Sequence, residues 1–347
     1  MNILGIETSC DETSAALLRD GRDILSNVIA SQTDLHAKFG GIVPEIASRK
    51  HVEVLNAVIQ EALDGAGVGF SDLNAVAVTN RPGLVGALLV GVAAAKAISA
   101  ALSIPLIGVH HLEGHIYANF LSPPCSLITD HSSLITFPFI CLVVSGGHTD
   151  LIVVKGHGDY EILGRTRDDA AGEAFDKSAR VLGLGYPGGP IIDQLAQKGN
   201  PTAVKFPRAK LDDTLDFSFS GIKTAVIRFF REKGAEFRIE DIAASFQAAV
   251  VDMLVNTTMT AVERTGIRRV ALAGGVAANS GLQKRMREEA DKCGLELSYP
   301  PPVLCTDNAA MIACAGYYHL IRGQTDGLDL NTIASQPLGL TAGDSKQ

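Results

Sequence analysis

The order of predicted elements near the start of the chain is repeated near its middle. Residues 2–18 read as an apolar strand, a hydroxyl-rich turn and a second apolar strand, and residues 24–30 as a third strand. Residues 137–154 repeat strand, small-residue turn and strand, and residues 160–163 supply the third strand. Helical patterns follow in both places. This repetition predicts an α/β protein of two related lobes, whose polar turns face one another across a central cleft.

The chain has 347 residues, which leaves room for about two domains of ordinary size. Residues 121–136 contain a Pro-Pro pair and a run of Ser, Asp and His, a composition typical of a loop. We therefore expect an N-terminal lobe over residues 1–125 and a C-terminal lobe over residues 126–347. The second lobe should contain a helical insertion at about residues 186–240.

Charge, cysteine content and hydropathy exclude several classes of protein. The net charge of −8 argues against a generally basic nucleic-acid-binding surface, and leaves only local patches at residues 49–51, 205–210 and 284–287. Six scattered cysteines without a Cys-x-x-Cys pair indicate a reduced, cytoplasmic protein, and no signal peptide is evident. Residues 83–102 are long and apolar enough to span a membrane. Because they are rich in Ala and Gly and contain Lys96, we interpret them as a buried core helix and expect no membrane association.

Three of the nine histidines lie within residues 110–115, where a predicted strand passes into a predicted helix. His111 and His115 are four residues apart, so on a helix they share one face and can bind one metal ion. Imidazole suits both zinc and iron. The alternative is a pair of surface or capping histidines. In the zinc-protease motif His-Glu-x-x-His the glutamate directly follows the first histidine, whereas Glu113 lies two positions after His111. Two residues along a helix correspond to a rotation of about 200°, so the Glu113 side chain points away from the face of His111 and His115. The spacing therefore disfavours a metalloendopeptidase.

A third metal ligand has to come from elsewhere in the chain. Asp307 is the best candidate, because it follows the last predicted strand at the carboxyl side of a parallel sheet, where ligands commonly bind. The alternative is that Asp307 or its neighbour Thr306 only caps the final helix.

Two further turns have the small-residue composition that suits binding to a phosphate. They are residues 145–149 and the pair Gly274-Gly275, each of which follows a predicted strand. Glycine permits close backbone approach to a phosphate or a flat ligand, although a simple tight turn would have the same composition. Asp11 and Glu12, in the first polar turn, would then lie beside such a phosphate or its metal.

Eight segments, in order over nearly the whole chain, together resemble the TsaD family, also called YgjD or Gcp. They are residues 7–14, 43–45, 111–115, 145–149, 169–177, 219–224, 274–279 and 306–309. The resemblance implies the actin-like ATPase/sugar-kinase (ASKHA) fold, with two related lobes around a cleft.

The resemblance also implies an acyltransferase that modifies tRNA. Members of the family transfer threonylcarbamoyl from threonylcarbamoyl-adenylate to N6 of the adenine 3′ of the anticodon, in tRNAs that read codons beginning with A. It implies one divalent metal ion per subunit, which is expected to be iron, with zinc as the alternative. It also implies that ATP or ADP can occupy the cleft that binds the donor. The implied partners are tRNA, a TsaB-type paralogous subunit and a TsaE-type ATPase, with a homodimer expected in isolation.

The family's site residues can be carried onto this sequence where the motifs match. The implied metal ligands are His111, His115 and Asp307. The implied substrate-binding residues are Val143, Val144, Ser145, Gly146, Gly147, Asp176, Gly189, Asp193 and Asn279. In the donor, a carbonyl needs polarisation and an AMP leaving group needs anion stabilisation, which a metal and Gly-rich turns can supply. Because an exocyclic adenine amine is a poor nucleophile, Asp11 or Glu12 is the catalytic candidate that accepts its proton or orients it.

The sequence departs from the family pattern in three places. Asn80-Arg81 stands where the family usually has Gly, Ser280-Gly281 replaces a frequently basic residue, and the linker over residues 121–136 is longer. The main competing function is a metal-dependent O-carbamoyltransferase acting on a small molecule, which would usually need an additional domain. A metalloendopeptidase, a non-catalytic scaffold like the paralogous subunit, and a sugar or acetate kinase also compete. Neither the scaffold nor the kinase requires the histidine pair.

Overall fold

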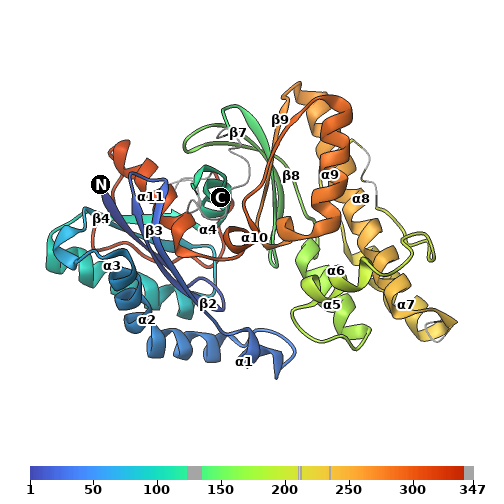
Figure 1. Ribbon diagram of the computed structural model, residues 1–347, viewed down its shortest axis with the longest axis horizontal. Coiled ribbons are helices and arrows are strands. Elements are labelled where there is room, and N and C mark those ends of the chain that lie inside the picture. Colours follow the sequence, from blue (N-terminus) through green and yellow to red (C-terminus); the bar gives the residue numbers. More distant parts are fainter. Residues whose placement is uncertain (123–134, 210, 212, 234–235, 340–347) are drawn as a thin grey trace, which may run out of the picture. The chain divides into compact units, whose positions relative to one another are not determined.

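The computed structural model describes most of the chain (Figure 1). The described residues are 1–122, 135–209, 211, 213–233 and 236–339. The predicted linker over residues 121–136 therefore lies largely outside the described residues.

The chain forms two compact units, and their boundary differs in part from the expected one. The first unit consists of Met1–Leu134 together with Thr306–Gln347, and the second is Ile135–Cys305. Residues 306–347 were expected in the second lobe, and this assignment is wrong. The physical reason is that the last helix packs on the sheet of the first unit.

The first unit is built on a five-stranded sheet with the order β3-β2-β1-β4-β5. The strands are β1 (Asn2–Glu7), β2 (Glu12–Arg19), β3 (Asp23–Ser31), β4 (Ala75–Arg81) and β5 (Leu106–His110). The first three strands pair antiparallel through short turns, whereas β1, β4 and β5 are parallel. Parallel pairing requires crossover connections. The helices α1 (Thr33–Ala37), α2 (Pro44–Ala66) and α3 (Val85–Leu102) lie within these connections.

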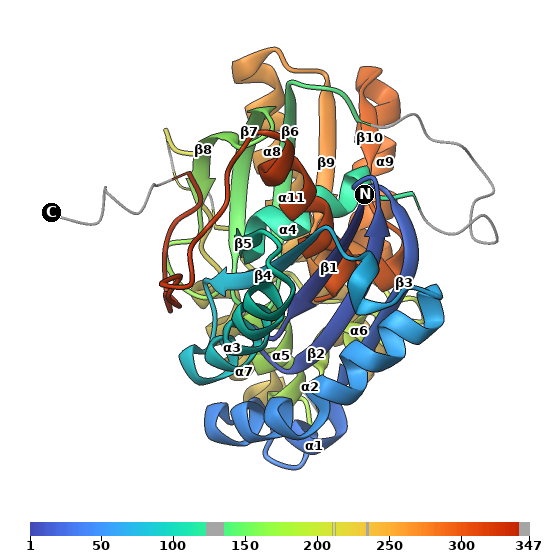
Figure 2. The ribbon, with the colours of Figure 1, turned by 90° about the vertical axis from the view of Figure 1, so that its left-hand side faces the viewer.

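Different helices cover the two faces of this sheet (Figure 2). Helices α2 and α3 pack on one face, around buried side chains such as Leu4, Ile6 and Val78. Helix α11 (Ala309–Ile321) packs on the other face. A Cβ atom built on Gly5 of β1 would lie only 2.2 Å from the carbonyl oxygen of Ala309, so α11 can approach this closely only because residue 5 is glycine. This contact places the residues that precede α11 next to the end of β1.

The apolar stretch predicted over residues 83–102 forms α3, but this helix is less buried than the core helix that we expected. Leu88 and Val92 are buried, whereas Val85 is 45% and Leu89 49% exposed. A helix that lies on the outside of a sheet buries only one stripe. By length and composition, α3 and α8 (Ile239–Thr265) are the two described helices apolar enough to cross a membrane, and 33% and 72% of their apolar windows are buried within the structure.

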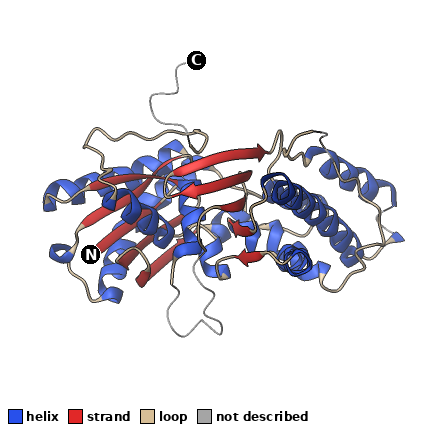
Figure 3. Ribbon diagram, turned by 90° about the horizontal axis from the view of Figure 1, so that it is seen from above, coloured by secondary structure: helices blue, strands red, loops and turns tan. Residues whose placement is uncertain are grey.

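The second unit repeats the topology of the first, with the order β10-β9-β6-β7-β8. Its strands are β6 (Phe139–Val144), β7 (Thr149–Gly156), β8 (Asp159–Arg165), β9 (Arg269–Ala273) and β10 (Glu296–Ser298). Again the first three strands are antiparallel, and β6, β9 and β10 are parallel. The strands of both sheets are red in Figure 3. The repeated unit predicted from the sequence is confirmed.

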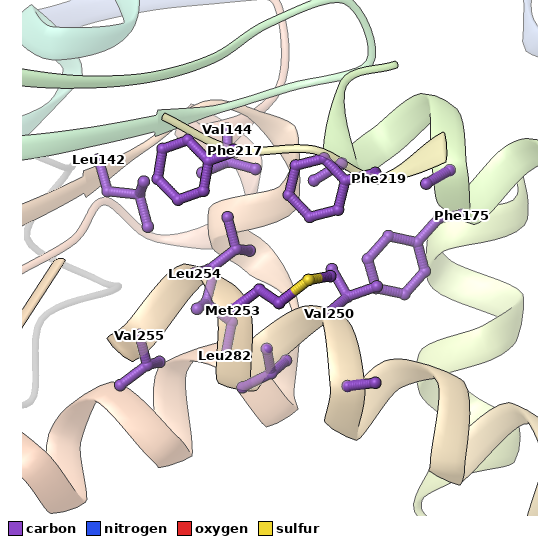
Figure 4. Close-up of a cluster of buried hydrophobic side chains, with 14 of the residues drawn as sticks. Leu142, Val144, Phe175, Phe217, Phe219, Val250, Met253, Leu254, Val255 and Leu282 are labelled. Atoms are coloured by element: carbon purple, nitrogen blue, oxygen red, sulfur yellow. The ribbon is translucent and has the colours of Figure 1, made fainter. Parts of the chain in front are cut away.

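Helix α8 lies at the centre of the second unit's core. Phe175, Phe217, Phe219 and Leu254 are among the side chains that pack between it and the sheet (Figure 4). Burying one such side chain contributes about 1.5–3 kcal/mol. The other helices are α5 (Ala171–Val181), α6 (Gly188–Ala196), α7 (Ser220–Lys233), α9 (Ser280–Cys293) and α10 (Pro302–Cys305). Helices α6 and α7 fall within the predicted insertion at about residues 186–240, and the segment between them contributes phenylalanines to the core.

Candidate functional site

The histidine segment folds as a strand that passes directly into a short helix. β5 ends at His110, and α4 (His111–Tyr117) begins at the next residue. His110 is the N-cap, since its side chain accepts a hydrogen bond from the backbone N–H of Leu112. The rings of His111 and His115 share one face of α4, with their centroids 4.6 Å apart. The predicted geometry of the pair is therefore present.

Asp307 faces this histidine pair and does not cap α11. The N-cap is Asn308, whose side chain accepts a hydrogen bond from the backbone N–H of Met311. The alternative that Thr306 or Asp307 serves as the cap is thus wrong, because the next residue satisfies the helix end and leaves the Asp307 carboxylate free to turn inward. Its Oδ1 lies 3.4 Å from Nε2 of His111 and 3.2 Å from Nε2 of His115. We call these three side chains the His-His-Asp cluster.

The His-His-Asp cluster has the donor set of a divalent metal site. The ligand atoms of its three residues lie within 4.8 Å of one another. His115 is fully buried; its Nδ1 has no hydrogen-bond partner among the described residues, and its Nε2 has only the Asp307 carboxylate, 3.2 Å away, beside it. Burial lowers the pKa of His115, so its ring is neutral and has a lone pair to offer. A buried nitrogen without a partner is unfavourable unless a ligand binds it. Two imidazoles and one carboxylate suit iron or zinc.

A buried carboxylate, Glu7, lies on the other side of the His111 ring. Glu7 is the last residue of β1, and its Oε2 lies 3.1 Å from Nδ1 of His111. Burial acts to lower the pKa of His111, but the charges of Asp307 and Glu7 raise it well above its usual value. Without a metal, the ring of His111 is therefore protonated on both nitrogens and carries a positive charge. The sequence analysis did not identify Glu7 as a neighbour of the histidines, because 104 residues separate it from His111.

Glu113 points away from the cluster, as the helical spacing predicts. Its Oε2 lies 2.8 Å from Nε2 of His319 on α11, and Glu113 is only 3% exposed. Burial lowers the pKa of His319, but Glu113 raises it enough that the net shift is upward. The pair therefore forms a buried salt bridge, and Glu113 is not placed as the general base of a zinc protease would be.

The first polar turn, between β1 and β2, holds the two carboxylates considered for catalysis. Asp11 is 7% exposed, and its carbonyl oxygen accepts a hydrogen bond from the backbone N–H of Gln32. Burial and the negative charges of Asp307 and Asp11 raise the pKa of Glu12 to about 10. Glu12 is therefore a neutral carboxylic acid at pH 7 in the metal-free protein. His51 of α2 supports the turn, because its Nε2 lies 3.0 Å from the carbonyl oxygen of Cys10.

In the second unit, the corresponding turn between β6 and β7 is open. Val143 and Val144 are buried strand residues, so they can offer only backbone groups to a ligand. The Ser145 hydroxyl accepts a hydrogen bond from the backbone N–H of His148. A Cβ atom built on Gly146 or Gly147 would meet no atom within 4 Å. The turn therefore has room for a ligand above its backbone.

Glycines hold two other segments close to this turn. A Cβ atom built on Gly172, near the start of α5, would lie 2.6 Å from the carbonyl oxygen of Ser145. One built on Gly274 would lie 2.4 Å from the carbonyl oxygen of Val144. The turn, the start of α5 and the Gly274-Gly275 segment are thus in direct contact. This is a backbone-lined arrangement of the kind that binds phosphates.

The remaining predicted substrate-binding residues form two hydrogen-bonded groups. Asp176 accepts a hydrogen bond from the backbone N–H of Gly188 at 2.7 Å. The neighbouring Gly189 has no atom within 4 Å of a built Cβ atom. This places an open backbone position next to the Asp176 carboxylate.

Asp193 and Asn279 are linked through Gln247, which the sequence analysis missed. Gln247 donates to Asp193 Oδ1 at 2.9 Å and accepts from Asn279 Nδ2 at 2.8 Å. Asp193 also accepts hydrogen bonds from the hydroxyl and the backbone N–H of Ser280. Ser280, one of the departures from the family pattern, thus holds the Asp193 carboxylate in place. Gln247 lies in the middle of a long helix and had no motif to mark it.

Comparison with known proteins assigns the chain to a family. A family model described as "TsaD: tRNA N6-adenosine threonylcarbamoyltransferase" matches residues 23–314. A curated relative from Symbiobacterium thermophilum, named tRNA N6-adenosine threonylcarbamoyltransferase, is 57% identical over 340 residues, with 97% of each chain covered. The chain belongs to the TsaD family.

Solved structures similar to this TsaD family member confirm the predicted actin-like fold. HypF from T. kodakarensis matches with a TM-score of 0.60 at 13% identity, over 93% of this chain and 48% of its own. Component A of (R)-2-hydroxyglutaryl-CoA dehydratase from Acidaminococcus fermentans matches with a TM-score of 0.53 at 17% identity, over 91% and 98%. Likeness at this level of identity shows the fold alone.

The basic segments that a TsaD family member could offer to an anionic partner are partly engaged in internal contacts. His51 is buried, so residues 49–51 do not form a continuous basic patch. Arg208 pairs with Asp252 at 2.7 Å, and Arg285 pairs with Glu289. Among the described residues of the other two segments, the other exposed cations are Lys205, Lys284 and Arg287, and Arg287 lies over the ring of Tyr299.

Proposed function

We propose that this protein transfers threonylcarbamoyl from threonylcarbamoyl-adenylate to N6 of the adenine 3′ of the anticodon, in tRNAs that read codons beginning with A. The observation that carries the proposal is membership of the TsaD family, with a relative of that named activity at 57% identity over nearly the whole chain. The donor and the position of the adenine follow from the family resemblance.

The His-His-Asp cluster is the proposed metal site, and His111, His115 and Asp307 would hold iron or zinc there. Support comes from the convergence of three ligand atoms and from the buried Nδ1 of His115, which has no hydrogen-bond partner among the described residues. When bound, such an ion supplies Lewis-acid polarisation of a carbonyl, or an anchor for the donor's oxygens. The protein's own contribution is to hold the three ligand atoms in place before the ion arrives.

We assign the adenylate part of the donor to the second unit. Residues 143–147 would contact it through backbone groups of β6 and through the open turn that follows. Asp176, Gly189, Asp193 and Asn279 would bind its sugar and base, with Gln247 fixing the orientation of Asp193 and Asn279. Backbone N–H groups that already point at a phosphate stabilise a departing AMP without reorganisation. ATP or ADP would fit the same donor chemistry.

The roles of Asp11 and Glu12 are proposed from their surroundings. In the metal-free protein the pKa of Glu12 is raised to about 10, chiefly by burial and then by the charges of Asp307 and Asp11, so Glu12 is protonated at neutral pH and does not accept a proton in that state. Asp11 is therefore the proposed acceptor of the amine proton, and Glu12 a hydrogen-bond donor beside it.

The proposed setting is the cytoplasm, with tRNA, a TsaB-type subunit and a TsaE-type ATPase as partners and a homodimer in isolation. Within the described residues, Cys10, Cys141, Cys293, Cys305 and Cys314 are free thiols, which suits a reducing compartment. A chain with a net charge of −8 needs partners or local cations to bind tRNA phosphates. Lys205, Lys284 and Arg287 are the exposed candidates.

The test is reconstitution from purified components. The metal-loaded protein is mixed with threonylcarbamoyl-adenylate, unmodified tRNA and the partner subunits, and tRNA nucleosides are analysed by mass spectrometry. We expect threonylcarbamoyladenosine with the wild type and none with His111→Ala. The matched control is His319→Gln, which replaces a half-buried histidine outside the cluster and should retain activity. Absence of product from a metal-loaded wild type would contradict the proposal and favour a small-molecule O-carbamoyltransferase.

A further inference from the structure

Glu7 is a fully buried carboxylate whose contacts connect the end of β1 to the His-His-Asp cluster. It is 0% exposed. Its Oε1 accepts a hydrogen bond from the backbone N–H of Ser9 at 2.5 Å, and its Oε2 accepts one from the Thr79 hydroxyl at 2.6 Å. The same Oε2 lies 3.1 Å from Nδ1 of His111. Both oxygens are therefore held in fixed positions beside the His111 ring.

His111 is the cationic partner of Glu7, and it shares its one positive charge between Glu7 and Asp307. Among the described residues, His111 is the only ion-pair partner of Glu7, and no Lys or Arg is in contact with it. An ionised carboxylate buried without a counter-charge is strongly unfavourable. Ser9 and Thr79 satisfy its hydrogen-bonding capacity but supply no charge. A buried glutamate at this position is therefore explained by its contact with His111 and by the metal ion that His111 would bind.

A carboxylate only accepts hydrogen bonds, so Glu7 determines which nitrogen of His111 carries the proton. Nδ1 must carry a hydrogen to bond Oε2 of Glu7. The hydroxyl oxygen of Ser9, 3.2 Å from Nδ1, lies beside the same N–H. In the neutral ring Nε2 then has a free lone pair, and Nε2 is the atom directed at Oδ1 of Asp307. The hydrogen bond from Nδ1 of His111 to Glu7 thus leaves Nε2 as the ligand atom.

We propose that Glu7 is a positioning residue for the metal centre: it fixes the tautomer and orientation of His111 and adds a second negative charge next to a bound dication. Carboxylates hydrogen-bonded to metal-binding imidazoles raise the basicity of the ligand nitrogen. This inference rests on the proposed metal site.

The test is Glu7→Gln, with zinc alone as the probe. Glutamine has the same shape, and its carbonyl can still accept the Ser9 N–H. With its amide nitrogen toward His111, it donates to Nδ1 and moves the ring proton to Nε2, where it blocks the ligand position. We expect a 10- to 100-fold weaker zinc affinity, measured by competition with a chromophoric chelator.

The matched control is Glu113→Gln, the same chemical change at a buried carboxylate on α4, bonded to His319 and not to a ligand. We expect its zinc affinity to remain within about twofold of the wild type, since no ligand contact changes. If Glu7→Gln binds zinc as tightly as the wild type, or if both variants lose affinity equally, the inference is wrong. If the wild type itself binds no zinc, the proposed metal site fails instead.

A second measurement needs no variant. Nitrogen-15 NMR of the zinc-loaded wild type reports which ring nitrogen of His111 carries hydrogen and which binds metal. We expect hydrogen on Nδ1 and zinc on Nε2. The reverse assignment would overturn the role of Glu7 even if Glu7→Gln does not fold.

Discussion

His115 should destabilise the metal-free protein and stabilise the metal-bound one. Substitution of His115 should therefore increase the stability of the metal-free protein and decrease the stability of the metal-bound protein. Its ring is fully buried, and its Nδ1 lacks a hydrogen-bond partner among the described residues. A buried polar group without a partner costs about 1–3 kcal/mol. His115→Leu replaces the ring by an apolar side chain of similar volume and removes this cost. In the presence of a chelator, we expect the variant to be as stable as the wild type or up to about 3 kcal/mol more stable.

Bound metal should make the wild type more stable than His115→Leu. At a free zinc concentration of 100 times Kd, a site that binds only the folded state gains about 2.7 kcal/mol. For a unit of this size, that corresponds to a rise in Tm of about 5–10 °C. The wild type should show this rise and His115→Leu should not, because two of three ligands cannot hold the ion as tightly. Differential scanning calorimetry with chelator and with zinc measures both terms.

The matched control is His319→Leu, the same change at a largely buried histidine that is paired. It removes the ion pair between His319 and the buried Glu113 and should therefore destabilise the protein by about 3 kcal/mol in both conditions, with the zinc-induced rise intact. The reasoning is refuted if His115→Leu destabilises the chelated protein as His319→Leu does, or if it retains the full zinc-induced rise in Tm.

Three further predictions follow from single contacts. Burial raises the pKa of Asp150 to about 6, so the stability of the folded state falls as pH rises from about 4 through 6. Asp150→Asn should therefore raise the free energy of unfolding by up to about 3 kcal/mol at pH 8 but not at pH 4. Urea titration at the two pH values measures this difference. Asn308→Ala removes the N-cap of α11 and should cost about 1 kcal/mol in urea titration, whereas Asn308→Asp should cost more, because it buries a carboxylate where the amide donates to the carbonyl oxygen of Thr306. Gly5→Ala places a Cβ atom 2.2 Å from the carbonyl oxygen of Ala309 and should lower Tm by several degrees, while alanine at the open position Gly189 should not.

Much of the fold could be predicted because it depends on local patterns. Strand, turn and strand recur in the same order in both halves, and each half forms a sheet with the same pairing. The histidine pair was also predictable, because spacing on a helix determines which side chains share a face. The burial of the helix over residues 83–102 was misjudged, since apolar composition does not say whether one side or all sides are covered.

Contacts between distant parts of the chain could not be predicted in the same way. Asp307 was identified as a ligand candidate, but the choice of Asn308 as the cap depends on backbone geometry that composition does not determine. Glu7 and Gln247 were missed because their partners lie far away in sequence. The same limit explains the wrong assignment of residues 306–347, whose place depends on the close approach that Gly5 allows.

The charges around the His-His-Asp cluster give a physical reason for the choice of its residues. Asp307 and Glu7 contribute two negative charges at opposite sides of His111, and His115 is neutral because burial lowers its pKa. In the metal-free protein one proton on His111 compensates only part of this charge. A dication with two neutral imidazoles would compensate both carboxylates in a buried place, where uncompensated charge is most unfavourable. The charge of the His-His-Asp cluster therefore favours a bound cation, as its ligand types do.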